Sequence, residues 1–241
     1  MSNDPKDPAS IARMAADVEL QAHARALFLG SCRYNYSYNF TWLGRPIIQY
    51  PQDLMALQEI IWLAKPELIV ETGIAHGGSL IFSASMLELL GGNGQVLGID
   101  VDIRPHNRVE IEKHPLARRI SMIAGSSTDE AVVAKAKARA SGKKSVLVIL
   151  DSNHTHEHVL KELQLYSGLV TPGSYLVVLD TVVEDMPKDF FPDRPWGPGN
   201  NPKTAVREFL RANRRFVVDE EMERKLLLTT APSGYLRCIA S

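Results

Sequence analysis

Residues 70–79 read VETGIAHGGS, and this stretch decides the fold. The apolar run ELIV at 67–70 leads into it, and the apolar run LIFSASMLELL at 80–90 follows it. An apolar strand, a glycine-rich turn and an apolar helix in this order are typical of a nucleotide-binding α/β unit, in which the turn holds the ligand. The first question is therefore which ligand this turn holds.

Strand-like apolar runs alternate with helix-length segments downstream of the turn. The runs are GQVLGIDV (94–101), RISMIAG (119–125), SVLVILD (145–151) and SYLVVLD (174–180), and residues 214–241 add a strand, a turn region and a final strand. Such alternation predicts a mostly parallel sheet with helices on both faces. We expect one structural domain, in which residues 1–60 form an N-terminal helix and lid segment and residues 61–241 form the catalytic domain.

The N-terminal quarter is less regular. The apolar period of residues 9–30 predicts one helix that ends at Gly30, after a frayed end at 1–7. Residues 31–53 are rich in Tyr and Asn, carry Trp42 and show little periodicity. This segment is either a ligand lid or an ordinary packed surface loop, and we favour the lid.

Composition limits the partners. The chain has 27 Lys and Arg against 28 Asp and Glu, so it lacks the electrostatic footprint of a protein that binds nucleic acid or an anionic membrane. We expect a small-molecule partner, with no nucleic acid and no membrane. Two distant cysteines, Cys32 and Cys238, predict neither a disulfide framework nor a cysteine zinc site. No run of membrane-spanning length and no signal peptide is evident, so we expect a cytoplasmic protein, and we also expect a homo-oligomer.

Polar residues stand at the ends of successive strands, where α/β sheets bind ligands. Glu71 ends the first strand and Asp100 the second, where a carboxylate suits ribose hydroxyls. The third ends in GSSTD (125–129), whose Ser126 and Ser127 suit an adenine pocket; Ser127 equally suits an N-cap of the next helix. Taken singly, Glu71 also fits a surface carboxylate and Asp100 a turn residue.

The spacing of the glycines narrows the ligand. The turn reads E-x-G-x-x-x-G-G-S, which is wrong for the G-x-G-x-x-G of a dinucleotide site, and it has no basic side chain to meet phosphate. An NAD-dependent oxidoreductase is therefore the disfavoured alternative. A ligand with ribose and adenine but no phosphate fits better, which indicates S-adenosylmethionine (SAM).

Three stretches resemble the cephalosporin hydroxylase family of class I SAM-dependent methyltransferases: residues 70–88, 96–108 and 150–187. The family is similar in layout to the catechol and macrolide-sugar O-methyltransferases, and the resemblance covers about the last three quarters of the chain. It implies a Rossmann-like, mostly parallel seven-stranded sheet with an antiparallel last strand. It also implies SAM as methyl donor, Mg²⁺ or another divalent cation, and a hydroxyl of a sugar or secondary metabolite as acceptor.

The resemblance also implies donor-binding residues. It places Glu71, Gly73 and Ser79 around the methionine part of SAM and Asp100 on the ribose. Ser127 and Ser126 would flank the adenine. The free N–H groups at the start of the helix after the turn would favour the donor carboxylate.

The chemistry is expected at the ends of the next two strands. Asp151, with His154 three residues later on the opening turn of a helix, matches the family pattern of a metal-binding aspartate followed by a general base. Asp180 is the expected second metal ligand, and Thr181 or Glu184 is the third. The cation makes the acceptor hydroxyl more acidic, and His154 takes its proton. The alternatives are that Asp151 is an N-cap and that Asp180 is a turn residue with no metal.

Two further alternatives concern the histidines and the activity as a whole. The cluster HTHEH (154–158) suggests a zinc hydrolase, but its order is not that of metallo-hydrolases, and we expect His156 and His158 to be solvated helix residues. Residues 190–210, which include Trp196, either set acceptor choice or are an ordinary proline-rich connection. An inactive methyltransferase-like partner protein is a third alternative, which Asp151 and His154 argue against.

Overall fold

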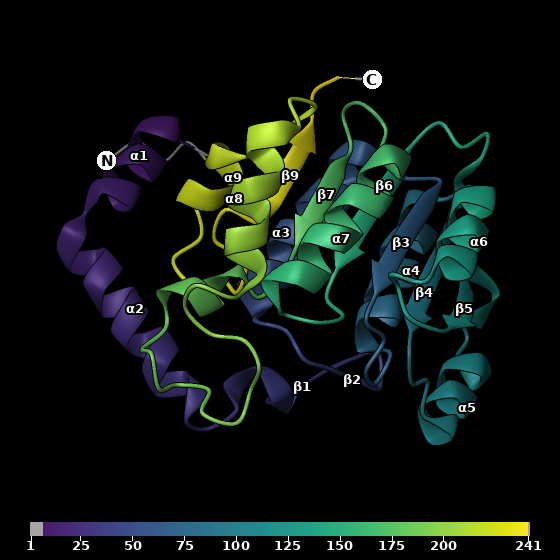
Figure 1. The fold of residues 1–241 in the computed structure, drawn as a ribbon, viewed down its shortest axis with the longest axis horizontal. Coiled ribbons are helices and arrows are strands. Elements are labelled where there is room, and N and C mark those ends of the chain that lie inside the picture. Colours follow the sequence, from purple (N-terminus) through teal and green to yellow (C-terminus); the bar gives the residue numbers. More distant parts are fainter. Residues whose placement is uncertain (1–6, 241) are drawn as a thin grey trace.

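The computed structural model describes residues 7–240 and is built around a seven-stranded sheet (Figure 1). The spatial order of its strands is β5-β4-β3-β6-β7-β9-β8. Their bounds are Leu68–Thr72 (β3), Gln95–Asp100 (β4), Ile120–Ala124 (β5), Val146–Leu150 (β6), Tyr175–Val178 (β7), Phe216–Val218 (β8) and Tyr235–Cys238 (β9). Five adjacent strands pair in parallel, and β9 lies antiparallel between β7 and β8. The predicted sheet and its antiparallel last strand are confirmed.

Helices cover both faces of the sheet (Figure 1). One apolar core lies under α6 (Glu130–Ala140), α7 (His156–Tyr166) and α8 (Pro202–Ala212), and the other lies under α3 (Pro51–Ala64), α4 (Gly78–Leu90), α5 (Pro105–Lys113) and α9 (Glu220–Arg224). All five residues of β3 and of β6 are buried, as strands covered on both faces require. This double cover leaves the carboxyl ends of the parallel strands as the open edge for a ligand.

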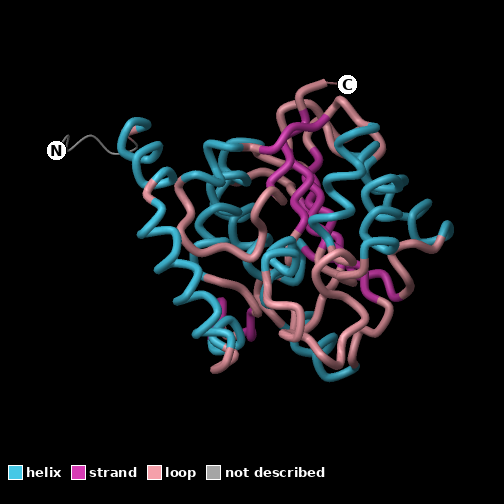
Figure 2. Tube along the Cα trace, turned by 60° about the vertical axis from the view of Figure 1, so that its left-hand side comes forward, coloured by secondary structure: helices cyan, strands magenta, loops and turns pink. Residues whose placement is uncertain are grey.

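The N-terminus forms two helices, and the prediction of one helix over 9–30 is wrong. Helix α1 spans Pro8–Ala16 and α2 spans Val18–Cys32, and both run along one side of the domain (Figure 2). Asp17 breaks them because its extended backbone and its side chain, which accepts from Leu20 N at 3.0 Å, form an N-cap. Gly30 does not end a helix; it lies inside α2. Residues 1–6 of the predicted frayed end lie outside the described residues.

Residues 31–53, here called the aromatic segment, contain a β-hairpin that the sequence pattern did not predict. Strands β1 (Phe40–Trp42) and β2 (Arg45–Ile47) are joined by Leu43 and Gly44, both with positive φ, as a two-residue hairpin turn requires. Trp42 packs edge-on against Phe82 of α4, with 4.9 Å between ring centroids, and donates to Ser85 Oγ. Strands of three residues are too short to show periodicity, which is why the hairpin was missed.

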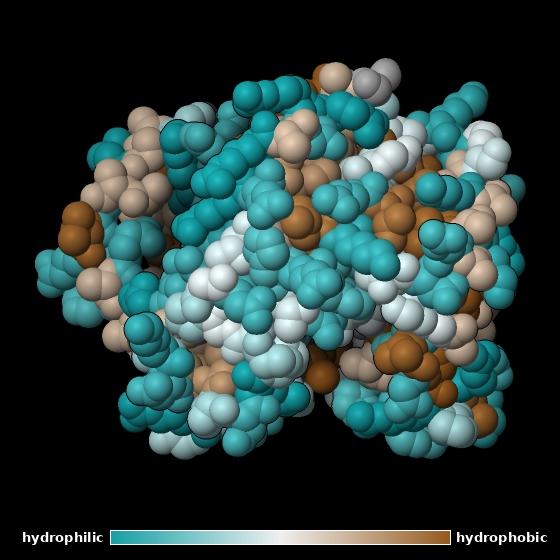
Figure 3. Space-filling view, viewed as in Figure 1, coloured by the Kyte–Doolittle hydropathy of each residue, from teal (hydrophilic) through white to brown (hydrophobic). Residues whose placement is uncertain are grey.

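The surface is polar over most of the face in Figure 3, with small and separate apolar patches. Within residues 7–240, no helix combines the length and the apolar character that crossing a bilayer requires. The proposed division at residue 60 stays a prediction, and α3 runs across it.

Candidate active site

Four acidic residues come together at the open edge of the sheet. Glu71 lies in β3 and Asp100 ends β4, while Asp151 directly follows β6 and Asp180 closely follows β7. These four strands are neighbours and run in parallel, so their carboxyl ends share one edge. The parallel order thus places the four predicted site residues at one end of the sheet, where α/β folds bind ligands.

The glycines of the turn are required by close contacts. Gly73 has a φ of 89°, and a Cβ there would lie 2.1 Å from the carbonyl oxygen of Asp151. A Cβ on Gly78, the first residue of α4, would lie 2.2 Å from the carbonyl oxygen of Pro46 in the hairpin. Gly73 thus lets the turn reach the end of β6, and Gly78 lets the hairpin cover the start of α4. A direct role of Gly73 with the donor stays a prediction.

Glu71 is a buried carboxyl group in this turn. It is 1% exposed, and its Oε1 accepts a hydrogen bond from the Ser79 hydroxyl, while its Oε2 has no partner among the described residues. Burial raises the pKa of Glu71 to about 7, against the opposing effect of the Ser79 hydrogen bond. The alternative of a surface carboxylate is wrong. An unpartnered buried oxygen calls for a ligand with a donor group.

Asp100 ties the turn to the end of β4. Its Oδ2 accepts from Ile74 N at 2.7 Å and from Ala75 N at 3.4 Å, and its Oδ1 accepts from Asp102 N at 3.0 Å. The carboxylate therefore shapes the glycine-rich turn in the free protein. Contact with a ribose stays a prediction.

Ser127 is not a helix cap. Helix α6 is capped by Asp129, whose side chain accepts from the amides of residues 131 and 132. The hydroxyl of Ser127 instead lies 3.1 Å from His158 Nε2, and that of Ser126 lies 3.0 Å from Thr128 Oγ1. The roles of Ser126 and Ser127 beside adenine stay predictions.

His156 and His158, which we expected to be solvated helix residues, are partly exposed but also make specific contacts. His158 Nε2 also lies 3.1 Å from Ser152 Oγ and 3.6 Å from Oε1 of the buried Glu162. His156 lies 2.8 Å from Thr204 Oγ1 and pairs with Glu208, both on α8. Helices α7 and α8 pack side by side, and this contact holds the His156 ring, whereas the His158 ring is held by Ser127, Ser152 and Glu162.

Asp151, His154 and Asp180 form a compact cluster. One ligand atom from each lies within 4.8 Å of the others, and His154 Nε2 is 3.2 Å from Asp180 Oδ2. His154 is in the loop before α7 and not on its first turn, because the Asn153 side chain accepts from the amide and hydroxyl of Thr155 and delays the helix. The N-cap alternative for Asp151 is wrong, since Thr155 is the cap residue.

The cluster carries an excess of negative charge. Burial raises the pKa of Asp151 well above its ordinary value, and the nearby carboxylates raise it further, in the order Asp180, Glu71, Glu162 and Asp53. Repulsion between carboxylates that are this close is relieved when a cation binds between them. The donor set of carboxylate oxygens and an imidazole therefore fits a divalent cation.

Neither predicted third ligand reaches the cluster. Thr181 is fully buried, and its hydroxyl donates to Pro232 O at 2.7 Å. Glu184 accepts from Gly199 N and pairs with Arg207. The third side chain of the cluster is His154, which the sequence placed only as a base.

A cavity of about 470 Å³ opens beside this cluster. It is lined by Tyr36 and Tyr38 of the aromatic segment and by Trp196 of the 190–210 insertion, as well as by the cluster itself. The Trp196 ring meets His154 edge-on at 4.9 Å, and Arg194 lies over the Trp196 ring at 5.2 Å. The expected lid segment, residues 31–53, and residues 190–210, for which acceptor choice was one of two interpretations, therefore both border the candidate catalytic residues.

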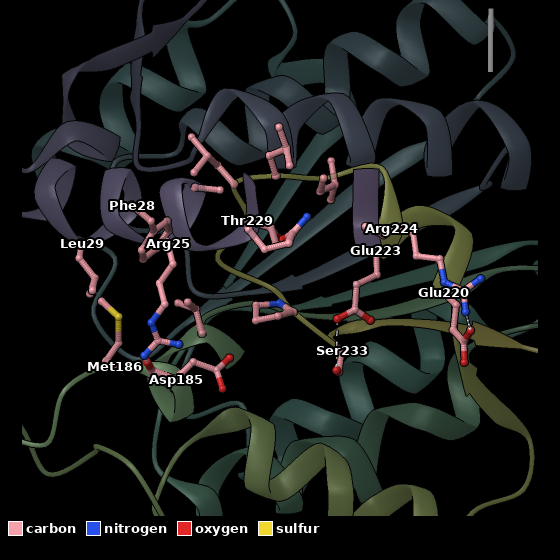
Figure 4. Close-up of a pocket in the computed structure, with 18 of the residues that line it drawn as sticks. Arg25, Phe28, Leu29, Asp185, Met186, Glu220, Glu223, Arg224, Thr229 and Ser233 are labelled. Carbon is pink, nitrogen blue, oxygen red and sulfur yellow. Dashed lines mark hydrogen bonds and ion pairs between the residues drawn. The ribbon is translucent and has the colours of Figure 1, made fainter. Parts of the chain in front are cut away.

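A cavity of about 770 Å³, larger than the one beside the cluster, lies elsewhere (Figure 4). It lies between α2, α9 and residues 226–233, and it contains none of the predicted site residues. Its charged side chains contact one another or nearby protein groups: Arg25 donates to the Asp185 carbonyl, Arg224 pairs with Glu220, and Ser233 lies 3.5 Å from Glu223. The charged groups of this cavity are thus already satisfied, and we place the chemistry at the smaller one.

Gln49 is a site residue that the sequence did not reveal. It lies between the hairpin and α3, is 5% exposed, and donates from Nε2 to Asp151 Oδ2 at 3.4 Å. It belongs to no motif, so only the tertiary structure could find it.

Comparisons with known proteins bear on the family and the fold of this chain. The model of the family described as Rhamnosyl O-methyltransferase/CmcI matches residues 34–239. A rhamnosyl O-methyltransferase of Mycobacterium bovis is 32% identical over 203 residues, which cover 81% of this chain and 77% of that protein. One of Mycobacterium leprae is 31% identical over 208 residues, which cover 84% and 85%. The solved structure of cmcI-D160 with Mg and SAM is 20% identical with a TM-score of 0.59, covers 84% of this chain and 78% of its own, and shares the fold.

Proposed function

We propose that this chain, which belongs to the rhamnosyl O-methyltransferase/CmcI family and is a SAM-dependent O-methyltransferase, methylates a hydroxyl group of a sugar with the help of a divalent cation. The observation that carries the proposal is the cluster of Asp151, His154 and Asp180 within 4.8 Å, beside a cavity of about 470 Å³. The names of the mycobacterial relatives support a sugar, with rhamnose as the first candidate.

The donor is proposed to lie along the carboxyl ends of β3, β4 and β5. Glu71 and Ser79 would hold its methionine part, Asp100 its ribose, and Ser126 and Ser127 its adenine. The start of α4 supports this arrangement, because its free amides favour the donor carboxylate. The buried Oε2 of Glu71, which has no partner in the part of the chain that the structure describes, supports it as well, because the donor ammonium can donate to it.

Asp151 and Asp180 would hold the cation, and the negative charge around Asp151 supports this assignment. When bound, the cation supplies Lewis acidity that makes the acceptor hydroxyl a better nucleophile. His154 Nε2 would take the hydroxyl proton, and Asp180 Oδ2, at 3.2 Å, would stabilise the protonated ring. The aromatic walls at Tyr36, Tyr38 and Trp196 would exclude water and stack on a sugar face.

The remaining expectations concern the class of activity, the assembly and the location. Membership of a methyltransferase family argues against the NAD-dependent oxidoreductase and the zinc hydrolase. The cluster of Asp151, His154 and Asp180 argues against the inactive partner protein. The homo-oligomer and the cytoplasmic location stay predictions.

The function is tested by incubating the chain with SAM, Mg²⁺ and a panel of glycosides that includes methyl rhamnoside. Mass spectrometry should find a product heavier by one methylene group together with S-adenosylhomocysteine (SAH). A chain that binds neither SAM nor SAH and methylates no glycoside would contradict the proposal.

Replacing Asp100 with alanine should raise the Kd of SAH at least tenfold. The change removes two charge-assisted hydrogen bonds to the ribose, each contributing about 1.5 to 3 kcal/mol. It also frees the amides of Ile74 and Ala75, so the melting temperature should be recorded beside the calorimetric Kd. Asp102→Ala, at an exposed aspartate two residues on, is the matched control and should bind SAH normally. Unchanged affinity in a folded Asp100→Ala protein would refute the ribose assignment.

SAH binding should strengthen as pH rises through about 7. The pKa of Glu71 is raised to about 7 by burial, so the carboxyl is neutral below this pH and cannot pair with the donor ammonium. Calorimetry in buffers of different ionisation enthalpy should detect proton release near pH 7, and Glu71→Gln should abolish it. A wild-type affinity that does not change between pH 6 and 8 would contradict this role.

The same shift predicts an effect on stability. Because the pKa of Glu71 is higher in the folded than in the unfolded protein, protonation of Glu71 stabilises the folded state. This contribution to the free energy of unfolding is complete below pH 4.5 and is lost as pH rises through about 7. A shift from 4.5 to about 7 corresponds to about 3 kcal/mol. Glu71→Gln should therefore raise the melting temperature of the free protein at pH 8.

A further inference from the structure

The position of the Gln49 side-chain amide is not explained by packing alone. Its Nε2 donates to Asp151 Oδ2 at 3.4 Å, and its Oε1 is buried with no partner among the described residues. The nitrogen and the oxygen of an amide point in different directions, so the Nε2 contact turns Oε1 away from Asp151. A buried amide oxygen without a hydrogen bond destabilises the fold unless a ligand satisfies it.

A second unpartnered acceptor lies in the same place. Gln49 and Glu71 both line a small cavity, together with Ser79, and Oε2 of Glu71 also has no partner within residues 7–240. The accessible volume is about 10 Å³, which is the size of one water molecule or one ammonium group. Leu54, Phe82 and other apolar side chains form the rest of its walls. Two residues that each carry an unpartnered acceptor among the described residues, one of them a carboxyl, therefore line a space that suits a single cationic group with several N–H donors.

We propose that Gln49 is a donor-positioning residue whose Oε1 accepts a hydrogen bond from the α-ammonium group of SAM. The inference rests on the proposed donor site and deepens it. Gln49 also lines the cavity of about 470 Å³ beside the catalytic cluster, here called the acceptor cavity, and a third cavity beside Gly73 and Ser79. One amide thus joins the amino-acid end of the donor to Asp151 at the catalytic cluster. The site should accordingly select adenosyl ligands that carry an α-ammonium group.

The test compares two ligands on matched variants. Calorimetry would measure the Kd of SAH and of its deaminated analogue for wild type, Gln49→Met and Gln52→Met. Methionine keeps the unbranched shape of glutamine without its hydrogen-bonding groups. Gln52 is the control because it also has an unpartnered buried amide oxygen and does not line these three cavities.

Wild type and Gln52→Met should bind SAH at least tenfold more tightly than the deaminated analogue, and Gln49→Met should lose about tenfold of that preference. An unchanged preference in Gln49→Met would overturn the inference and leave the donor site standing. No SAH binding by wild type would overturn the proposed function itself. Melting temperatures identify a variant that does not fold, and Gln49→Leu would then replace Gln49→Met in the same comparison.

Discussion

Replacing His154 with alanine should lower kcat by about 10²–10⁴ and leave the Kd of SAH unchanged. A positioned general base contributes about this factor, and His154 lies between Asp180 and Trp196 on the wall of the acceptor cavity. The donor residues lie on other strand ends, so donor binding should not depend on the ring. The rate would be measured with the glycoside that gives the highest turnover, and SAH binding by calorimetry.

His156→Ala is the matched control for this prediction. His156 lies two residues away and contacts Thr204 and Glu208 of α8, so its loss should lower the melting temperature slightly and leave kcat nearly unchanged. If His156→Ala abolished turnover and His154→Ala did not, the assignment of the base would be wrong.

The geometry of His154 allows a second role, as a metal ligand, and one measurement separates the two. Its Nε2 is part of the cluster in which the three ligand atoms lie within 4.8 Å. A base accepts a proton without holding the cation, so His154→Ala should bind Mn²⁺ about as tightly as wild type in a titration followed by electron paramagnetic resonance. A large loss of Mn²⁺ affinity would identify His154 as the third ligand and leave the base to another group.

The sheet and the acidic strand ends could be predicted from the sequence because both depend on short-range patterns. Buried parallel strands give continuous apolar runs such as VLVIL at 146–150, and the polar residue after each run marks the ligand edge. The short-range pattern gave a wrong prediction at Asp17, where one helix was expected to continue. The apolar period continues through it, while the helix break depends on one side-chain hydrogen bond to Leu20 N.

The remaining site residues depend on contacts between distant segments. Gln49 and Asp151 are 102 residues apart, and no local pattern joins them. Thr181 and Glu184 were plausible ligands by their position after Asp180, but Pro232 and Gly199 take up their hydrogen bonds. A single sequence gives the type and the order of polar residues, whereas the direction of each side chain is set by tertiary packing.

Removing divalent cations with EDTA should reduce methyl transfer by about 10³-fold or more and leave SAH binding largely intact. The cation is proposed to act on the acceptor, where metal ions supply several kcal/mol of transition-state stabilisation, and the donor residues belong to other strands. Adding Mg²⁺ or Mn²⁺ should restore turnover. Calorimetry with SAH in the presence of EDTA shows whether the donor site survives.

Asp151→Asn separates loss of the metal from loss of the fold. Asparagine has nearly the same shape but no charge, and it relieves the repulsion among Asp151, Asp180 and Glu71. The variant should therefore melt at the same or a higher temperature than the cation-free wild type, and added Mn²⁺ should stabilise only the wild type. Full turnover after chelation, or equal Mn²⁺ stabilisation of both proteins, would mean that Asp151 and Asp180 hold no cation. Their close approach would then have to be explained by a shared proton.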